Sequence, residues 1–211
     1  MMGSAEAFLR EMDALAPRRC IGVSLRGRGR SEAPPDGYTF QHHISDIQAI
    51  IKTTGLRSFC LMAWSIGVPY SIGYASRDPE LVSGLILLDY PARYPAFSLE
   101  WVDRTMARLS GTVSTHVITG LQHDSSEVLL WDRLQDIRCP VLVIGGGQAD
   151  SLLKPEHVEK YRHYLPRAEI AVFKDSGHDV SQPDYNRFIA TVKLFLSRCD
   201  EKANPSQREL V

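Results

Sequence analysis

At 211 residues, 44% of them hydrophobic, the chain can bury one sizeable core, so we expect a single domain with at most a small insertion. A formal net charge of −1 argues against a surface built for nucleic acid or for an anionic membrane. No run reads as a signal peptide or approaches the roughly 18–20 apolar residues of a membrane span, so we expect a cytoplasmic protein.

In chain order, five short apolar runs are typical of strands that are covered on both faces of a parallel sheet. They span residues 18–25, 57–63, 83–89, 139–145 and 168–173. Helical patterns lie before, between and after them, over residues 4–16, 39–55, 66–77, 155–165 and 184–198. Strands that alternate with helices predict a doubly wound α/β domain with a mostly parallel sheet.

The alternation breaks once, over residues 91–137, which contain no convincing strand. Two pieces of this segment, residues 99–110 and 125–134, have helical patterns. We therefore expect residues 1–90 and 138–211 to form the α/β core and residues 91–137 to form a small helical lid inserted into it.

The stretch "AWSIG", residues 63–67, joins an apolar strand pattern to a helical one. In a nucleophile elbow a serine occupies such a corner, and the residues two before and two after it are small so that chain segments can approach. Ala63 and Gly67 stand at those positions around Ser65. The alternative is a serine that only caps a helix after a core strand.

An acid and a histidine follow Ser65 in the order that a nucleophile elbow requires. Asp150 lies in the glycine-rich stretch after the fourth run, and His178 lies in the stretch after the fifth. Because the carboxyl ends of parallel strands share one edge of a sheet, we expect all three side chains at that edge. Asp89, which ends the third run, is the alternative acid.

These features together resemble the α/β-hydrolase superfamily, in its lid-bearing branch of esterases, lactonases and carbon–carbon bond hydrolases. The resemblance covers nearly the whole chain and is carried by "SLRGRGRSEAP" (24–34), "AWSIG" (63–67), "IRCPVLVIGGGQAD" (137–150) and "SGHDVSQPDYNRFIATVKLFL" (176–196). Two positions of residues 24–34 depart from the loop that the family has after its fourth strand. Ser24 stands where the family usually has aspartate, and Arg28 where it often has histidine.

The resemblance implies a catalytic triad of Ser65, Asp150 and His178, with the backbone N–H of Ile66 as an oxyanion-hole donor. Trp64, beside the nucleophile, either lines the substrate pocket or belongs to the core. No cofactor and no metal ion is implied, and the expected partner is a small acyl substrate.

The same resemblance predicts an N-terminally incomplete chain, because the first helical pattern begins at residue 4. The family has strands and a His-Gly loop before this helix, and that loop donates the second oxyanion N–H. In the family one of these missing strands lies between the strands expected at residues 18–25 and 57–63. Without it, the backbone N–H and C=O groups of these two strands would lack partners. Three explanations stay open: the chain is a fragment, it begins at a late start codon, or a partner strand or a second copy of the chain completes the sheet.

The favoured function is a serine hydrolase that cleaves a small ester, a lactone or a related carbonyl compound through an acyl-enzyme. One alternative is a binding module of the same fold that is weakly active or inactive. A second is a non-hydrolytic, haloperoxidase-like use of the same residues. The sequence does not identify the substrate.

Overall fold

The computed structural model describes residues 3–109 and 112–202. The chain divides into two compact units. One unit comprises Met1–Lys52 and Tyr94–Val128, and the other comprises Thr53–Arg93 and Leu129–Val211.

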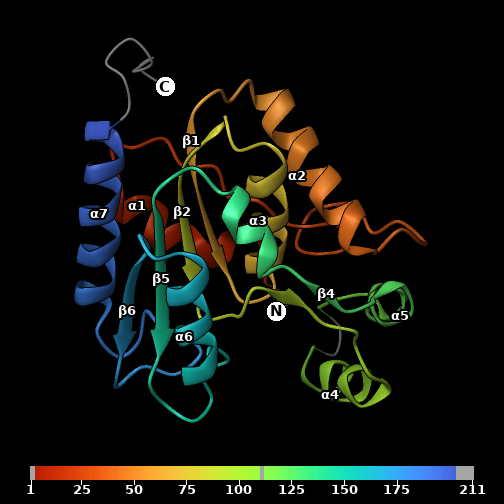
Figure 1. The fold of residues 1–211 in the computed structure, drawn as a ribbon. Coiled ribbons are helices and arrows are strands. Elements are labelled where there is room, and N and C mark those ends of the chain that lie inside the picture. The colour runs from red at the N-terminus through yellow and green to blue at the C-terminus, as the bar shows by residue number, and fades with distance from the viewer. Residues whose placement is uncertain (1–2, 110–111, 203–211) are drawn as a thin grey trace. The chain divides into compact units, whose positions relative to one another are not determined.

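The second unit is built on a four-stranded sheet (Figure 1). Its strands are β1 (Phe59–Trp64), β2 (Val82–Leu88), β5 (Val141–Gly146) and β6 (Glu169–Phe173), in the spatial order β1-β2-β5-β6. Each neighbouring pair is parallel. The parallel sheet and its helices confirm the predicted α/β fold class. All four strands therefore end at the same edge.

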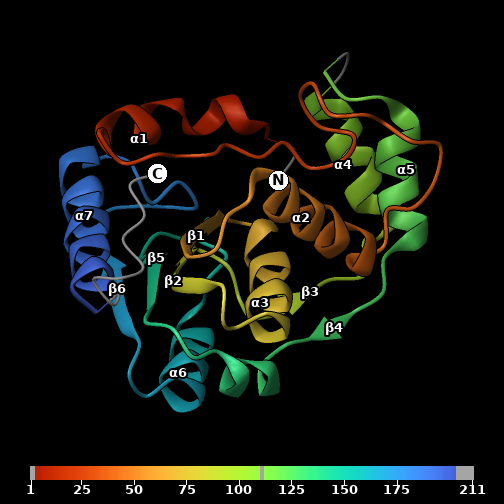
Figure 2. The ribbon, with the colours of Figure 1, turned by 90° about the horizontal axis from the view of Figure 1, so that it is seen from above.

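Helices cover both faces of this sheet (Figures 1 and 2). The helix α7 (Tyr185–Lys202) lies on one face, and α3 (Gly67–Arg77) and α6 (Pro155–Tyr164) lie on the other. The central strands β2 and β5 are buried along almost their whole length. This double cover explains why their sequences are continuously apolar rather than alternating.

Four of the five predicted strands are confirmed, but the first is wrong. Residues 18–25 form no regular secondary structure, and the side chains of Ile21 and Val23 are each 38% exposed. A run with strand-like composition forms a strand only where a neighbouring strand pairs with its backbone N–H and C=O groups. In the sheets of the described residues, no strand pairs with this segment.

The first unit is mostly helical. It contains η1 (Ala5–Phe8), α1 (Leu9–Ala14), most of α2 (Phe40–Thr54), α4 (Leu99–Leu109) and α5 (Thr115–Asp124). Tyr38 is fully buried here; its N–H donates to Asp124 and its hydroxyl donates to the carbonyl of Pro34. The first hydrogen bond ties the loop before α2 to the end of α5, and the second closes the loop on itself.

A buried arginine–histidine pair accounts for the unusual Arg28. Its guanidinium donates to the Arg26 carbonyl at 2.7 Å and to His43 Nε2 at 2.9 Å. Burial and the positive charge of Arg28 lower the pKa of His43 to about 3. His43 is therefore neutral near pH 7, accepts at Nε2 and donates from Nδ1 to the Thr39 carbonyl.

The segment predicted as a lid is less helical than its sequence indicates. Two-residue strands, β3 (Arg93–Tyr94) and β4 (Val128–Leu129), pair with each other, and η2 (Asp132–Asp136) follows. The helix predicted over residues 125–134 is thus wrong, while α5 went unpredicted. Residues 94–128 group with the first unit. That residues 91–137 act as a lid remains a prediction.

Among the described residues, no helix is long and apolar enough to cross a membrane.

We expect Gly84→Ala to destabilise the second unit. A Cβ at Gly84, in β2, would lie 2.8 Å from the sulfurs of both Cys60 and Cys199. Overpacking of this kind typically lowers the free energy of unfolding by about 1–3 kcal/mol. Urea unfolding followed by circular dichroism measures the loss. The control is Gly67→Ala, whose Cβ would meet Ala63 at an ordinary 3.5 Å. Equal stability of the two variants would contradict the close packing at Gly84.

Candidate active site

Ser65 occupies the predicted corner between a strand and a helix. It follows β1, and Ile66 separates it from the first residue of α3. Its φ is +57°, a left-handed backbone that costs an L-residue about 1–2 kcal/mol. Its N–H still donates to the Leu88 carbonyl of the neighbouring strand, at 3.0 Å. Strain held in place by surrounding structure is typical of functional sites.

Small residues surround the corner as the sequence predicts. An added Cβ at Gly67 would lie 3.5 Å from the Cβ of Ala63, so the two positions face each other across the turn. A larger side chain at Ala63 would meet the start of α3. An alanine at position 63 therefore fits the available space.

His178 lies between β6 and α7, and its imidazole contacts Ser65. The distance from His178 Nε2 to Ser65 Oγ is 3.0 Å. The other ring nitrogen, Nδ1, lies 2.8 Å from Oδ2 of Asp89. The His178 side chain is 23% exposed, while Asp89 is fully buried and Ser65 is buried.

Asp89 follows β2 and also has a left-handed backbone, with φ of +49°. Its carboxylate accepts hydrogen bonds from the N–H of Gly146 (3.0 Å), the hydroxyl of Ser151 (2.6 Å) and the N–H of Leu152 (2.9 Å), besides His178. Burial alone would raise the pKa of Asp89, but these hydrogen bonds outweigh it and hold the pKa below its usual value.

The ionised carboxylate fixes the protonation of the imidazole. Because Asp89 can only accept, Nδ1 of His178 carries the hydrogen and Nε2 offers its lone pair to the Ser65 hydroxyl. The proton of Ser65 can pass to Nε2, and the carboxylate stabilises the imidazolium that results. The arrangement is thus able to activate a serine hydroxyl.

The structure does not place the Asp150 carboxylate on the imidazole, where the predicted triad has it; the alternative acid, Asp89, lies there. Asp150 Oδ2 accepts instead from the backbone N–H of His178, at 3.3 Å. A Cβ at Gly177 would lie 2.2 Å from the Asp150 carboxylate, so this carboxylate packs on the chain just before the ring. Asp89 reaches the ring because β2 lies beside β1, and the left-handed turn ends that strand next to Ser65.

Two further residues of the site escaped the sequence analysis. Ser151 is buried and donates to Asp89, but nothing in its sequence context distinguishes it from an ordinary loop serine. Gly146 donates its N–H to Asp89 and lies against the histidine loop. A Cβ at Gly146 would lie 2.2 Å from the Gly177 carbonyl oxygen, so only glycine fits here.

Trp64 and Ile66 flank the serine. The indole of Trp64 stacks on the His178 imidazole, with ring centroids 4.9 Å apart and planes inclined by 29°. Its Nε1–H donates to the His178 carbonyl at 2.8 Å. Ile66 precedes the first residue of α3, so its N–H belongs to the positive end of the helix dipole.

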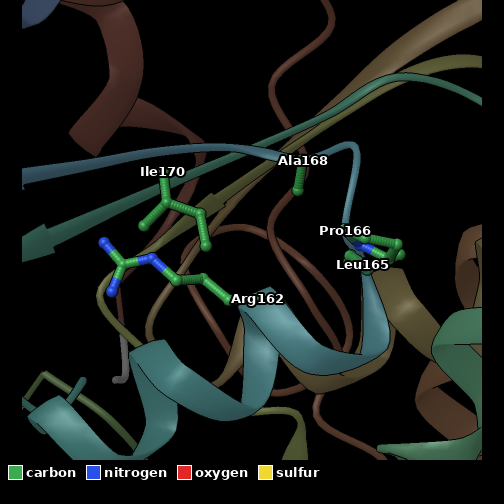
Figure 3. Close-up of a pocket in the computed structure, with 5 residues that line it drawn as sticks. All are labelled: Arg162, Leu165, Pro166, Ala168 and Ile170. Atoms are coloured by element: carbon green, nitrogen blue, oxygen red, sulfur yellow. The ribbon is translucent and has the colours of Figure 1, made fainter.

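A pocket of about 370 Å³ lies elsewhere, between α6 and the start of β6 (Figure 3). It is lined by Arg162, Leu165, Pro166, Ala168 and Ile170. Ser65, Asp89 and His178 follow the carboxyl ends of their strands, whereas this pocket adjoins the amino end of β6. It is therefore not the space in which these three side chains would meet a ligand. Among the described residues, no group of three or more His, Cys, Asp or Glu could hold a metal ion.

The chain is similar to known proteins over most of its length. A family model described as the alpha/beta hydrolase fold matches residues 1–129. N-formylmaleamate deformylase of Pseudomonas putida is 25% identical over 207 residues, covering 82% of this chain and 77% of that protein. 2-(Acetamidomethylene)succinate hydrolase of Mesorhizobium japonicum is 30% identical over 90 residues, covering 43% of this chain and 31% of that protein.

Solved structures share the fold. An esterase from Exiguobacterium antarcticum has a TM-score of 0.78 at 22% identity, over 93% of this chain and 88% of that chain. A putative aryl esterase from Burkholderia cenocepacia has a TM-score of 0.79 at 19% identity, over 96% and 89%. At such identities the likeness concerns the fold and not the activity.

We expect glycine to be more stable than alanine at position 65. At an ordinary helical position alanine is favoured over glycine by about 0.5–1 kcal/mol. At a φ of +57° the alanine is strained and glycine is not, so the order should invert by about 1 kcal/mol. Chemical unfolding of Ser65→Gly and Ser65→Ala measures the difference.

The matched pair is Ser76→Gly and Ser76→Ala, inside α3, where alanine should be the more stable. The same order at both positions would show that Ser65 is not strained.

Proposed function

Because the chain belongs to the alpha/beta hydrolase fold family, we propose that it is a serine hydrolase acting on a small ester, a lactone or a related carbonyl compound. The observation that supports this is the hydrogen-bonded series Ser65–His178–Asp89, with the left-handed backbone at its two outer members. Ser65 is the nucleophile, His178 the general base and Asp89 the residue that orients and stabilises the imidazole.

The reaction runs in two halves. Ser65 Oγ attacks the substrate carbonyl carbon as Nε2 of His178 takes its proton, and the N–H of Ile66 donates to the oxyanion. His178 then returns the proton to the leaving group, and an ester bond to Ser65 remains. Water attacks this acyl-enzyme with His178 again as base, which releases the acid and restores the hydroxyl.

The substrate class takes some guidance from the relatives. The deformylase and the succinate hydrolase are named for reactions on compounds that carry a carboxylate. A substrate panel should therefore pair short neutral esters with acyl compounds that bear a carboxylate. Selective turnover of either set would define the substrate class that the sequence leaves open.

A fluorophosphonate probe should label the folded wild-type protein at Ser65, because such probes trap a serine activated by a neighbouring base. Labelling should disappear in Ser65→Ala and persist in Ser76→Ala, a serine of α3 outside the site. Mass spectrometry of the labelled peptide identifies the position. Absence of labelling in a folded protein would instead support the alternative of a binding module.

The two aspartates should differ sharply in kcat for ester hydrolysis. Asp89→Asn replaces the acceptor on Nδ1 and should lower kcat by about 10⁴-fold, as in serine proteases. Asp150→Asn keeps an oxygen that can accept from the His178 N–H, so we expect a loss below about 10-fold. Steady-state kinetics at pH 7 measures both. A larger loss in Asp150→Asn would return the acid's role to Asp150.

A further inference from the structure

We propose that Trp64 is a positioning residue, which holds His178 by its ring face and by its backbone carbonyl. The inference rests on the proposed function and deepens it. From the sequence, Trp64 reads as a pocket or core residue. The structure points to a role that acts through the histidine.

Two separate contacts join Trp64 to His178. The indole face lies on the imidazole, with centroids 4.9 Å apart, and the indole N–H donates to the His178 carbonyl at 2.8 Å. A tryptophan that only filled space would need neither of them. Here the hydrogen bond from the indole N–H fixes the position of the His178 backbone, and the indole face fixes the tilt of the imidazole ring.

The peptide groups on either side of the imidazole are each held by a hydrogen bond to a different segment of the chain. The N–H of His178 donates to Asp150, in the loop after β5, and its carbonyl accepts from Trp64, at the end of β1. The loop is thereby fixed on both sides of the residue that must transfer the proton. Asp150 and Trp64 thus hold the same peptide segment, although of the two only Asp150 belongs to the predicted triad.

The ring itself has one remaining freedom that Trp64 limits. Hydrogen bonds at Nδ1 and Nε2 fix the two edges of the imidazole, to Asp89 and Ser65. Rotation about the line between those nitrogens would still tilt the ring. It would turn the Nε2 lone pair away from Ser65 and the Nδ1 hydrogen away from Asp89. The indole blocks this rotation on one face.

The stack also favours the charged intermediate state. His178 becomes an imidazolium when it takes the serine proton, and a cation over an indole within about 6 Å is attracted to the ring. The centroid distance of 4.9 Å satisfies that condition. The interaction therefore strengthens as the reaction proceeds, which is the kind of contact that raises kcat.

The strained corner allows two successive residues to reach the same histidine. Along an extended strand, neighbouring side chains point to opposite faces. The left-handed φ of Ser65 breaks this alternation directly after Trp64, so that the hydroxyl meets Nε2 while the indole covers the ring. The backbone strain thus aligns the nucleophile and the support of its base together.

The test is a double-mutant cycle between Trp64 and His178, read out as ester hydrolysis. Trp64→Leu should lower kcat by about 10- to 100-fold, the cost of a small misplacement of a catalytic group, with KM within about 2-fold. Trp64→Phe keeps a stacking face but loses the N–H, so it should recover part of this loss. In a His178→Ala background, Trp64→Leu should change the residual rate by less than about 3-fold.

The control is Trp131→Phe, in a tryptophan that packs against Tyr161 and His157 and not on His178. We expect its kcat to stay near the wild-type value. Circular dichroism confirms folding of each variant, and Trp64→Phe carries the cycle if Trp64→Leu does not fold.

Three outcomes overturn the inference. A rise in KM at unchanged kcat would make Trp64 a pocket residue, full activity of Trp64→Leu would make it dispensable, and an equal loss with and without His178 would make its role merely structural. None of these touches the proposed function, which fails if the folded wild-type protein is not labelled at Ser65 or if Ser65→Ala and His178→Ala keep wild-type activity.

Discussion

The left-handed backbone at Ser65 and Asp89 is the constraint on which the site depends. The strands β1 and β2 are parallel neighbours, with Trp64 paired to Leu88, so the two residues leave the sheet at the same level. Each conformation costs about 1–2 kcal/mol, which is a substantial part of a typical total stability of about 5–15 kcal/mol. Hydrogen bonds to the neighbouring strands help to offset this free energy, because the N–H of Ser65 still donates to the Leu88 carbonyl and that of Asp89 to the Ile144 carbonyl.

The buried carboxylate is the second demand on the structure. A charge removed from water is tolerated only when hydrogen bonds replace its hydration. Asp89 obtains three donors from one segment, residues 146–152, and the fourth from His178. The same segment carries Asp150, whose carboxylate serves the backbone of His178. One segment, from the end of β5 to Leu152, therefore supports both partners of the ion pair that the proposed proton transfer would form.

The sequence predicted the parts of the site that local pattern determines. Ser65 follows from an apolar run, small flanking residues and a helical pattern, and His178 from its place after the last strand. The choice between Asp89 and Asp150 did not follow, because both end up at one edge of the sheet and only backbone direction decides which carboxylate faces the ring. The strand predicted over residues 18–25 was wrong for a related reason. Apolar composition indicates a strand, but a strand forms only beside a neighbouring strand, which no local pattern specifies.

The geometry around His178 depends on the register of the whole sheet. His178 follows β6, and each of the other three strands supplies it with a partner: Trp64 ends β1, Asp89 follows β2 and Asp150 follows β5. A shift of one residue in the register of any strand would turn its side chains to the opposite face. The imidazole would then lose one of its supports, and in β2 a side chain would enter the space that Gly84 leaves to Cys60 and Cys199. The alignment of the proton-transfer groups and the packing of the core therefore depend on the same strand register.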